Sequence, residues 1–128
     1  MRKLYIVDSG VQYGADIRFL LQDAPIKHAV KAAGKLLTDS ENNAFIYIMD
    51  DSEGYTYVQF PQTVWPLLAD SLGAETEPIL VWGDTEISLL HFREELSMLI
   101  FNIEGNHNYG SEFSAAVEQS FKEQLAIY

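Results

Sequence analysis

Hydrophobic and polar residues alternate in short runs through the first two thirds of this chain and recur at helical spacing after that. The segments Lys3–Val7 and Asp16–Leu21 have the alternation and composition of strands. We predict a turn between them at Ser9-Gly10, with Gly14 as a second break. Further on, the alanines between Ala29 and Leu37 favour a helix, whereas Gly34 disfavours one. Both alternatives stay open there, and we favour extended chain over residues 35–38.

The middle of the chain predicts a hairpin. Aromatic and β-branched residues fill Ala44–Met49 and Tyr55–Phe60, and the polar segment Asp50–Gly54 between them has the composition of a turn. By the period of two, Tyr55 and Tyr57 lie on one face of their strand. We expect them to pack against the sheet or to form an aromatic protein-binding face.

Proline ends the second strand of this hairpin at Pro61, and a helix is predicted next. Its N-cap is expected at Thr63 with Pro66 in the first turn, and Gly73 is expected to end it. Its apolar face is traced by Val64, Leu67, Leu68 and Leu72.

A second hairpin and two helices complete the prediction. The segments Pro78–Trp82 and Thr85–Leu89 flank a turn at Gly83-Asp84, and helical spacing follows over Leu90–Glu104 and Ser111–Ile127. The first helix is apolar on nearly every side around Met98–Phe101, so we expect it to be buried centrally or in a subunit contact. The pattern predicts an α+β fold: one domain over residues 1–128 with a mainly antiparallel sheet of about six or seven strands, covered on one face by three helices.

Composition narrows the protein classes. The chain has 128 residues, a formal charge of −11 and no cysteine, which excludes disulfides, thiolate metal sites and thiol nucleophiles. The first apolar run ends at Asp8 and is too short for a signal peptide, and no run is long enough to cross a bilayer. We therefore expect a cytoplasmic protein without a membrane partner.

The charge is unevenly distributed. Residues 1–35 hold six of the eight basic side chains and three acidic ones, for a formal +3, whereas the remaining residues carry −14. An acidic body repels phosphate backbones, so we expect no nucleic-acid binding. The basic segment either attracts the rest of its own chain or docks an acidic partner, such as a second copy.

Two clusters are candidates for chemistry. His91, Glu94 and Glu95 lie within one helical turn, a spacing that can hold a metal ion, although zinc-protease motifs need a second histidine. The simpler alternative is a solvated helix start, where Glu94 and Glu95 favour the positive end of the helix dipole.

The second cluster is the loop Asn106, His107, Asn108 and Tyr109, between Gly105 and Gly110. Gly105 is expected in the left-handed conformation that ends a helix, so the loop has a structural explanation. Its amide, imidazole and phenol groups also make it a candidate site for a small polar ligand.

Other motifs are incomplete. The segment Asp39–Asn43 has alternating oxygen ligands, but Ala44 stands where a calcium loop needs glycine. No phosphate-binding glycine loop or nucleophile elbow is present, so we assign no catalytic residue and expect no cofactor.

Several ordered blocks stand out along the chain: Leu36–Ser40, Ala44–Tyr47, Tyr55–Tyr57, Phe60–Pro61, Val64–Pro66, Phe92–Leu96 and Ile103–Gly110. Together they resemble an uncharacterised family of small proteins from Bacillus-type Gram-positive bacteria. The likeness covers about residues 34–121 and implies a cytoplasmic bacterial protein of unassigned function.

Three hypotheses follow for the function. The first is a non-enzymatic interaction domain that self-associates, as a dimer, through the Leu90–Glu104 helix or an exposed strand edge, with another protein as a possible partner. The second is a small-ligand or metal-assisted enzyme that uses His91, Glu94, Glu95 and the Asn106–Tyr109 loop. The third and weakest is an acidic decoy of nucleic acid.

Overall fold

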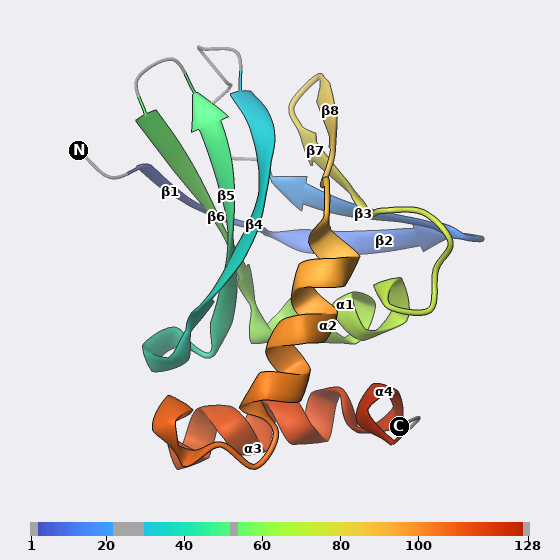
Figure 1. The fold of residues 1–128 in the computed structure, drawn as a ribbon. Helices are drawn as coiled ribbons and strands as arrows, with labels where there is room; N and C mark the ends of the chain where they lie inside the picture. The colour runs from blue at the N-terminus through green and yellow to red at the C-terminus, as the bar shows by residue number, and fades with distance from the viewer. Residues whose placement is uncertain (1–2, 22–29, 52–53, 127–128) are drawn as a thin grey trace.

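The structure is a computed structural model that describes residues 3–21, 30–51 and 54–126 (Figure 1). These residues form eight strands, four α-helices and three short 3-10 turns. The strands are β1 (Lys3–Ile6), β2 (Ser9–Tyr13), β3 (Asp16–Leu21), β4 (Val30–Asp39), β5 (Ala44–Asp51), β6 (Gly54–Pro61), β7 (Ile79–Trp82) and β8 (Thr85–Ser88). The helices are α1 (Trp65–Ser71), α2 (Phe92–Ile103), α3 (Ser111–Ser120) and α4 (Lys122–Leu125), and the 3-10 turns are Ser40–Asn42, Gln62–Val64 and His107–Tyr109.

The α+β class is confirmed, and the described strands divide between two four-stranded sheets instead of forming one. The first sheet has the order β1-β6-β5-β4, with β1 parallel to β6 and the other pairs antiparallel. The second has the order β2-β3-β7-β8, with β3 parallel to β7. Figure 1 shows the two sheets crossing at a steep angle, with α1 and α2 beside them and α3 and α4 below.

The chain passes from one sheet to the other at Val7 and Asp8. The Val7 amide donates to the Gln59 carbonyl of the first sheet over 2.9 Å, and the Asp8 amide donates to the Leu20 carbonyl of the second over 2.9 Å. The predicted turn at Ser9-Gly10 is therefore wrong, because both residues belong to β2. Gly10 lies where Leu67 of α1 packs directly onto the strand, so a Cβ atom there would overlap that side chain.

Both predicted hairpins are confirmed. Strands β5 and β6 pair along their whole length, and Asp50, Asp51 and Gly54 of the predicted turn belong to these strands. Strands β7 and β8 turn at Gly83, as predicted, and its φ of +60° is a left-handed conformation that favours glycine. The segment favoured as extended lies within β4.

The core lies between the sheets and the helices. Aromatic side chains from both sheets and three helices are almost fully buried there and meet edge to face or tilted, as in Phe19 with Phe60 and Phe60 with Phe92. A second group joins the first sheet to the helices below it, and it consists of Phe45, Trp65, Phe113 and Phe121.

The helices differ from the prediction in three respects. The residue before α1 is Val64, not Thr63, because a 3-10 turn precedes the helix, while Pro66 lies in the first turn as expected. The helix predicted from Ser111 is interrupted at Phe121, where the backbone leaves helical geometry and α4 begins, and its expected end at Ile127 lies outside the described residues. Helix α2 is amphipathic, because Ile100 is buried while Met98 is 48% exposed. It is therefore not buried on all sides.

Candidate functional site

The first sheet has one face against the core and one face toward solvent. We call the solvent side the outer face. The register places its side chains in three rows: Leu4, Tyr57, Ile48 and Lys35; Ile6, Gln59, Ile46 and Leu37; and Tyr55, Asp50 and Lys31, with Asp39 beyond the second row at the end of β4. An antiparallel sheet face turned to water normally carries polar side chains, whereas seven of these residues are apolar or aromatic.

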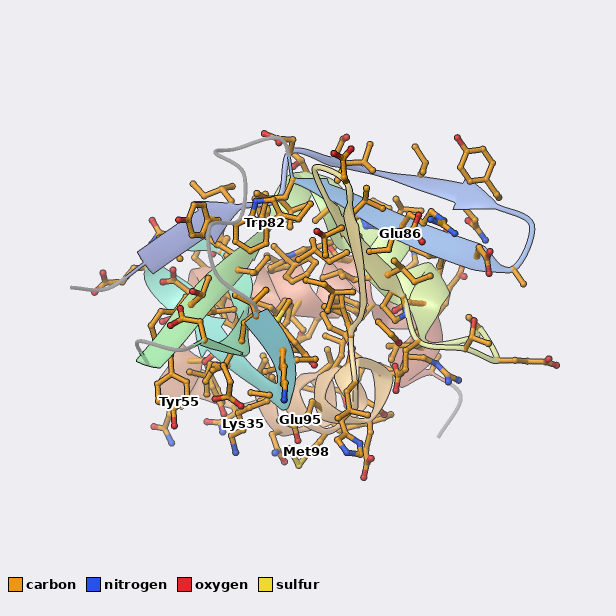
Figure 2. All side chains as sticks on the ribbon, turned by 90° about the horizontal axis from the view of Figure 1, so that it is seen from above. Lys35, Tyr55, Trp82, Glu86, Glu95 and Met98 are labelled. Carbon is orange, nitrogen blue, oxygen red and sulfur yellow. The ribbon has the colours of Figure 1, made fainter. Side chains whose placement is uncertain are left out.

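Most of the outer face is accessible, whereas Ile46 (8% exposed) and Gln59 (7%) in its second row are buried. Tyr55 is 58% exposed, Ile6 is 50% and Leu4 is 45%, and they come from the neighbouring strands β6 and β1. None of the helices in the described chain covers this face: they lie on the opposite side of the sheet or below it (Figure 1). Figure 2 shows Tyr55 pointing away from the body of the molecule. A contiguous apolar sheet face of this kind marks an interaction surface.

The outer face is also balanced in charge. It carries Lys31 and Lys35 on β4, Asp50 on β5, and Asp39 at the end of β4. Neither lysine forms an ion pair within the part of the chain that the structure describes. This face is therefore formally neutral, although the whole chain carries −11.

The start of α2 fixes β4 beside it. Strand β4 bulges between Ala32 and Lys35, and Gly34 in the bulge has a φ of +76°, which favours glycine. The Tyr47 hydroxyl accepts a hydrogen bond from the Gly34 amide (3.3 Å) and donates one to the Leu90 carbonyl (2.6 Å). Burial raises the pKa of Tyr47 to about 12. Tyr47 therefore stays neutral and connects the bulge to the residues that precede α2.

The candidate metal residues lie at this junction but do not converge. The His91 Nδ1 atom lies 3.5 Å from a Glu94 carboxylate oxygen, whereas the Glu95 carboxylate accepts a hydrogen bond from the Leu36 amide of β4 over 3.1 Å. No three histidine, aspartate or glutamate side chains of residues 3–21, 30–51 and 54–126 form a group that could hold a metal ion. Glu95 is instead part of the contact between α2 and β4.

The Asn106–Tyr109 loop uses its polar groups to hold its own conformation. The Asn106 side-chain oxygen accepts from the Asn108 amide (3.0 Å), and its carbonyl accepts from the Ser114 hydroxyl (2.9 Å). Gly105 has the expected left-handed conformation, with a φ of +70°, and the Tyr109 ring packs on Phe113. The side chain of His107 lies outside the described part of the structure.

The two candidate clusters lie at opposite ends of α2. His91 precedes this helix and the Asn106–Tyr109 loop follows it, and twelve helical residues span about 18 Å. The structure therefore does not bring them into one site. Ligand binding by the loop alone stays a prediction.

Sequence reasoning found only part of the outer face. The alternation of β6 indicated that Tyr55 and Tyr57 share a face, which the register confirms. It did not place Leu4 and Ile6 beside them, because β1 reaches β6 through a parallel pairing between segments far apart in the sequence. Alternating apolar residues in β1 indicated a strand but not its neighbour.

Comparison with known proteins supplies the family. A family model described as a family of unknown function, UPF0738, matches residues 5–121. The chain belongs to the UPF0738 family. The resemblance seen in the sequence blocks is thereby confirmed, and it extends toward the N-terminus beyond the segment first recognised.

Relatives in the family are similar over nearly the whole chain. A UPF0738 protein of Lysinibacillus sphaericus (strain C3-41) is 43% identical over 126 residues, which cover 98% of this chain and 99% of the relative. A UPF0738 protein of Staphylococcus aureus (strain Newman) is 36% identical over 119 residues, covering 93% and 96%. No solved structure matches this chain. The described residues contain no helix that is long and apolar enough to span a membrane.

Proposed function

We propose that this UPF0738 protein is a non-enzymatic interaction domain that pairs with a second copy of itself through the outer face. The observation that carries the proposal is the apolar character of that face, where exposed side chains of β1 and β6 adjoin the half-buried Ile48 and Tyr57. Apolar side chains gain free energy when a partner removes them from water.

Charge favours a second copy as the partner. Most of the surface of a −11 protein repels another copy, whereas the outer face carries two lysines and two aspartates. In a two-fold pairing that reverses the strand direction, the Lys31 end of one β4 lies over the Asp39 end of the other. The same patch can thus be complementary to itself.

The size of the face sets the strength of the pairing. Four strands about 4.8 Å apart, with about six residues each, give a projected area of about 400 Å². Protruding side chains increase the accessible area, which still lies toward the lower end of specific interfaces, because a typical one buries about 800 Å² on each partner. We expect a dissociation constant in the micromolar range, because small interfaces leave little surplus over the entropy cost of association.

The compartment is part of the same proposal. A cytoplasmic location is supported by the absence of cysteine from the sequence, which suits a reducing environment.

Analytical ultracentrifugation over a concentration series tests the pairing. We expect the wild-type chain to shift from monomer to dimer, and Tyr55→Glu to remain monomeric because it places a carboxylate in the apolar face. The matched control is Tyr13→Glu, since Tyr13 is 69% exposed on β2 of the other sheet. A wild-type chain that stays monomeric to millimolar concentration, or equal dissociation of both variants, would refute the proposal.

A further inference from the structure

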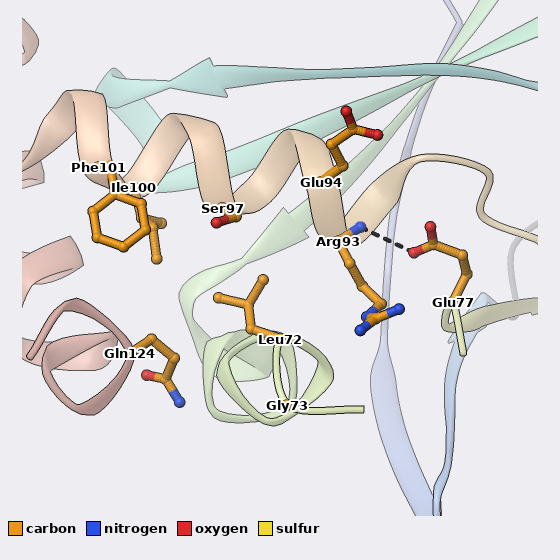
Figure 3. Close-up of a pocket in the computed structure, with 9 residues that line it drawn as sticks. All are labelled: Leu72, Gly73, Glu77, Arg93, Glu94, Ser97, Ile100, Phe101 and Gln124. Atoms are coloured by element: carbon orange, nitrogen blue, oxygen red, sulfur yellow. Dashed lines mark hydrogen bonds between the residues drawn. The ribbon is translucent and has the colours of Figure 1, made fainter. Parts of the chain in front are cut away.

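A groove lies between the end of α1, one face of α2, and Gln124 of α4 (Figure 3). Its volume is about 500 Å³, within the range of small-molecule sites. Helix α2 contributes Arg93, Ser97 and Ile100, whose spacing places them on one side of the helix. None of these groups belongs to the outer face.

The middle of the groove is apolar. Ile100 is fully buried beneath it, and Leu72 and Phe101 are half-buried along it. Gln124 is held at the far side by a hydrogen bond from its Nε2 atom to the Ala69 carbonyl, over 3.2 Å. The walls therefore offer a short hydrocarbon or aromatic group a surface away from water.

Arg93 supplies a cation at one end of the groove. Its Nε atom donates to the Ser71 carbonyl at the end of α1, over 3.1 Å, which fixes the plane of the guanidinium. No described carboxylate forms an ion pair with Arg93, although acidic residues outnumber basic ones by 19 to 8 in this chain. The two terminal amino groups remain available to a carboxylate, which arginine binds with two parallel hydrogen bonds.

The neighbouring glutamates are directed elsewhere. The Glu77 carboxylate accepts from the Arg93 main-chain amide over 3.0 Å, so it caps the start of α2. A Glu94 carboxylate oxygen lies 3.5 Å from the His91 Nδ1 atom, and Figure 3 shows this carboxylate pointing away from the groove. The negative charge of Glu77 disfavours a ligand with two negative charges, such as a phosphate monoester, more than a monoanion.

From these contacts we infer that the groove binds a small amphipathic monocarboxylate. Its carboxylate accepts hydrogen bonds from the Arg93 guanidinium, and its apolar part lies against Leu72 and Phe101, above the buried Ile100. The arrangement of one oriented cation beside an apolar wall matches the two halves of such a ligand. This inference is independent of the pairing through the outer face.

Titration with decanoate tests the inference, with decanol as the uncharged control of equal chain length. Amide NMR resonances of Gly73, Ser97 and Phe101 are expected to shift with decanoate, which should bind at least about tenfold more tightly than decanol. Equal affinity for the two compounds, or shifts confined to the outer face, would overturn it. Tyr55→Glu should bind decanoate like the wild type, so failure of the dimer leaves this result intact.

Variants assign the charge selectivity to Arg93. Arg93→Gln is expected to lower decanoate affinity by about tenfold or more and to leave decanol binding unchanged. Lys122→Gln is the matched control, because Lys122 is an exposed cation on the neighbouring α4. Ser97→Glu places a carboxylate one turn from Arg93, where it competes with decanoate for the guanidinium. It should weaken the binding of decanoate but not of decanol, so it tests the site even if Arg93→Gln does not fold. Unchanged decanoate affinity in Ser97→Glu, or in a folded Arg93→Gln, would refute the assignment.

Discussion

The hydroxyl of Tyr47 offers a direct test of how the first sheet is joined to α2. The side chain is fully buried, and its hydroxyl makes two hydrogen bonds that no other described side chain replaces: from the Gly34 amide and to the Leu90 carbonyl. Tyr47→Phe removes one oxygen atom and leaves the ring in place. The perturbation therefore isolates the polar contacts from the packing.

The expected loss of stability is about 2 kcal/mol at pH 8. A satisfied hydrogen bond contributes about 1 kcal/mol net, and a buried group left without a partner costs about 1–3 kcal/mol. The Leu90 carbonyl, whose bond is the shorter at 2.6 Å, belongs to a half-exposed residue that water can partly reach. This access keeps the total well below the sum of two full penalties.

The pH dependence of the unfolding free energy tests the same contacts of Tyr47 in a second way. Burial raises the pKa of Tyr47 to about 12, above the usual value of about 10 for an unfolded chain. Above pH 10 the unfolded chain loses this proton before the folded chain does. The stability due to the neutral hydroxyl is therefore complete below pH 10 and is lost as the pH rises toward 12. Phenylalanine has no proton to lose, so the stability gap between wild type and Tyr47→Phe should narrow over this range.

Urea denaturation at pH 8, 9, 10 and 11, followed by circular dichroism, measures both effects. The denaturant midpoint should fall in Tyr47→Phe at pH 8 with the slope unchanged, because the surface exposed on unfolding is the same. The difference between the two proteins should then shrink at pH 11. A gap that is absent at pH 8, or that stays constant to pH 11, would contradict the described burial and hydrogen bonding.

Two further predictions concern the bulge and the contact between β3 and β8. Gly34→Ala should destabilise the chain by about 1–2 kcal/mol, because its φ is +76° and a Cβ atom would lie 2.9 Å from the His91 ring. The control is Gly83→Ala, because Gly83 has a φ of +60° and open space around its Cβ position, so this variant reports backbone strain alone. Thermal unfolding compares the two variants, and equal losses of stability would show that the contact with His91 is unimportant. The Arg18–Glu86 ion pair, 2.9 Å long and partly exposed, should contribute at most about 1 kcal/mol and weaken with salt, so a larger, salt-independent coupling in a double-mutant cycle would contradict this reading.

The basic side chains of the N-terminal segment lie in two different environments in the structure. Arg18 pairs with Glu86 of β8, so part of the basic segment binds its own acidic body. Lys31 and Lys35 point outward from β4 beside Asp50 instead. The sequence showed the contrast but not this division, because the division depends on which face of each strand turns toward the core.

The periodicity of the sequence was enough for the local elements. Alternation over Ala44–Met49 and Tyr55–Phe60, with a polar turn between them, specified a hairpin, because adjacent strands pair through contacts that are close in sequence. Helical spacing likewise specified α2 and the region of α3, where buried residues recur every three or four positions. The α+β class follows from these elements alone.

Tertiary structure alone decided which strands are neighbours and which polar residues meet. The parallel pairings of β1 with β6 and of β3 with β7 join segments far apart in the chain, and a period of two reports the faces of a strand without naming its partner. Periodicity therefore could not place Leu4 and Ile6 on the outer face. It also could not place Arg93 beside the end of α1 in the groove. His91 and the Asn106–Tyr109 loop lie at opposite ends of α2, so the length of this helix keeps them apart. The sequence predicted the helix, but its direction in space depends on how it packs.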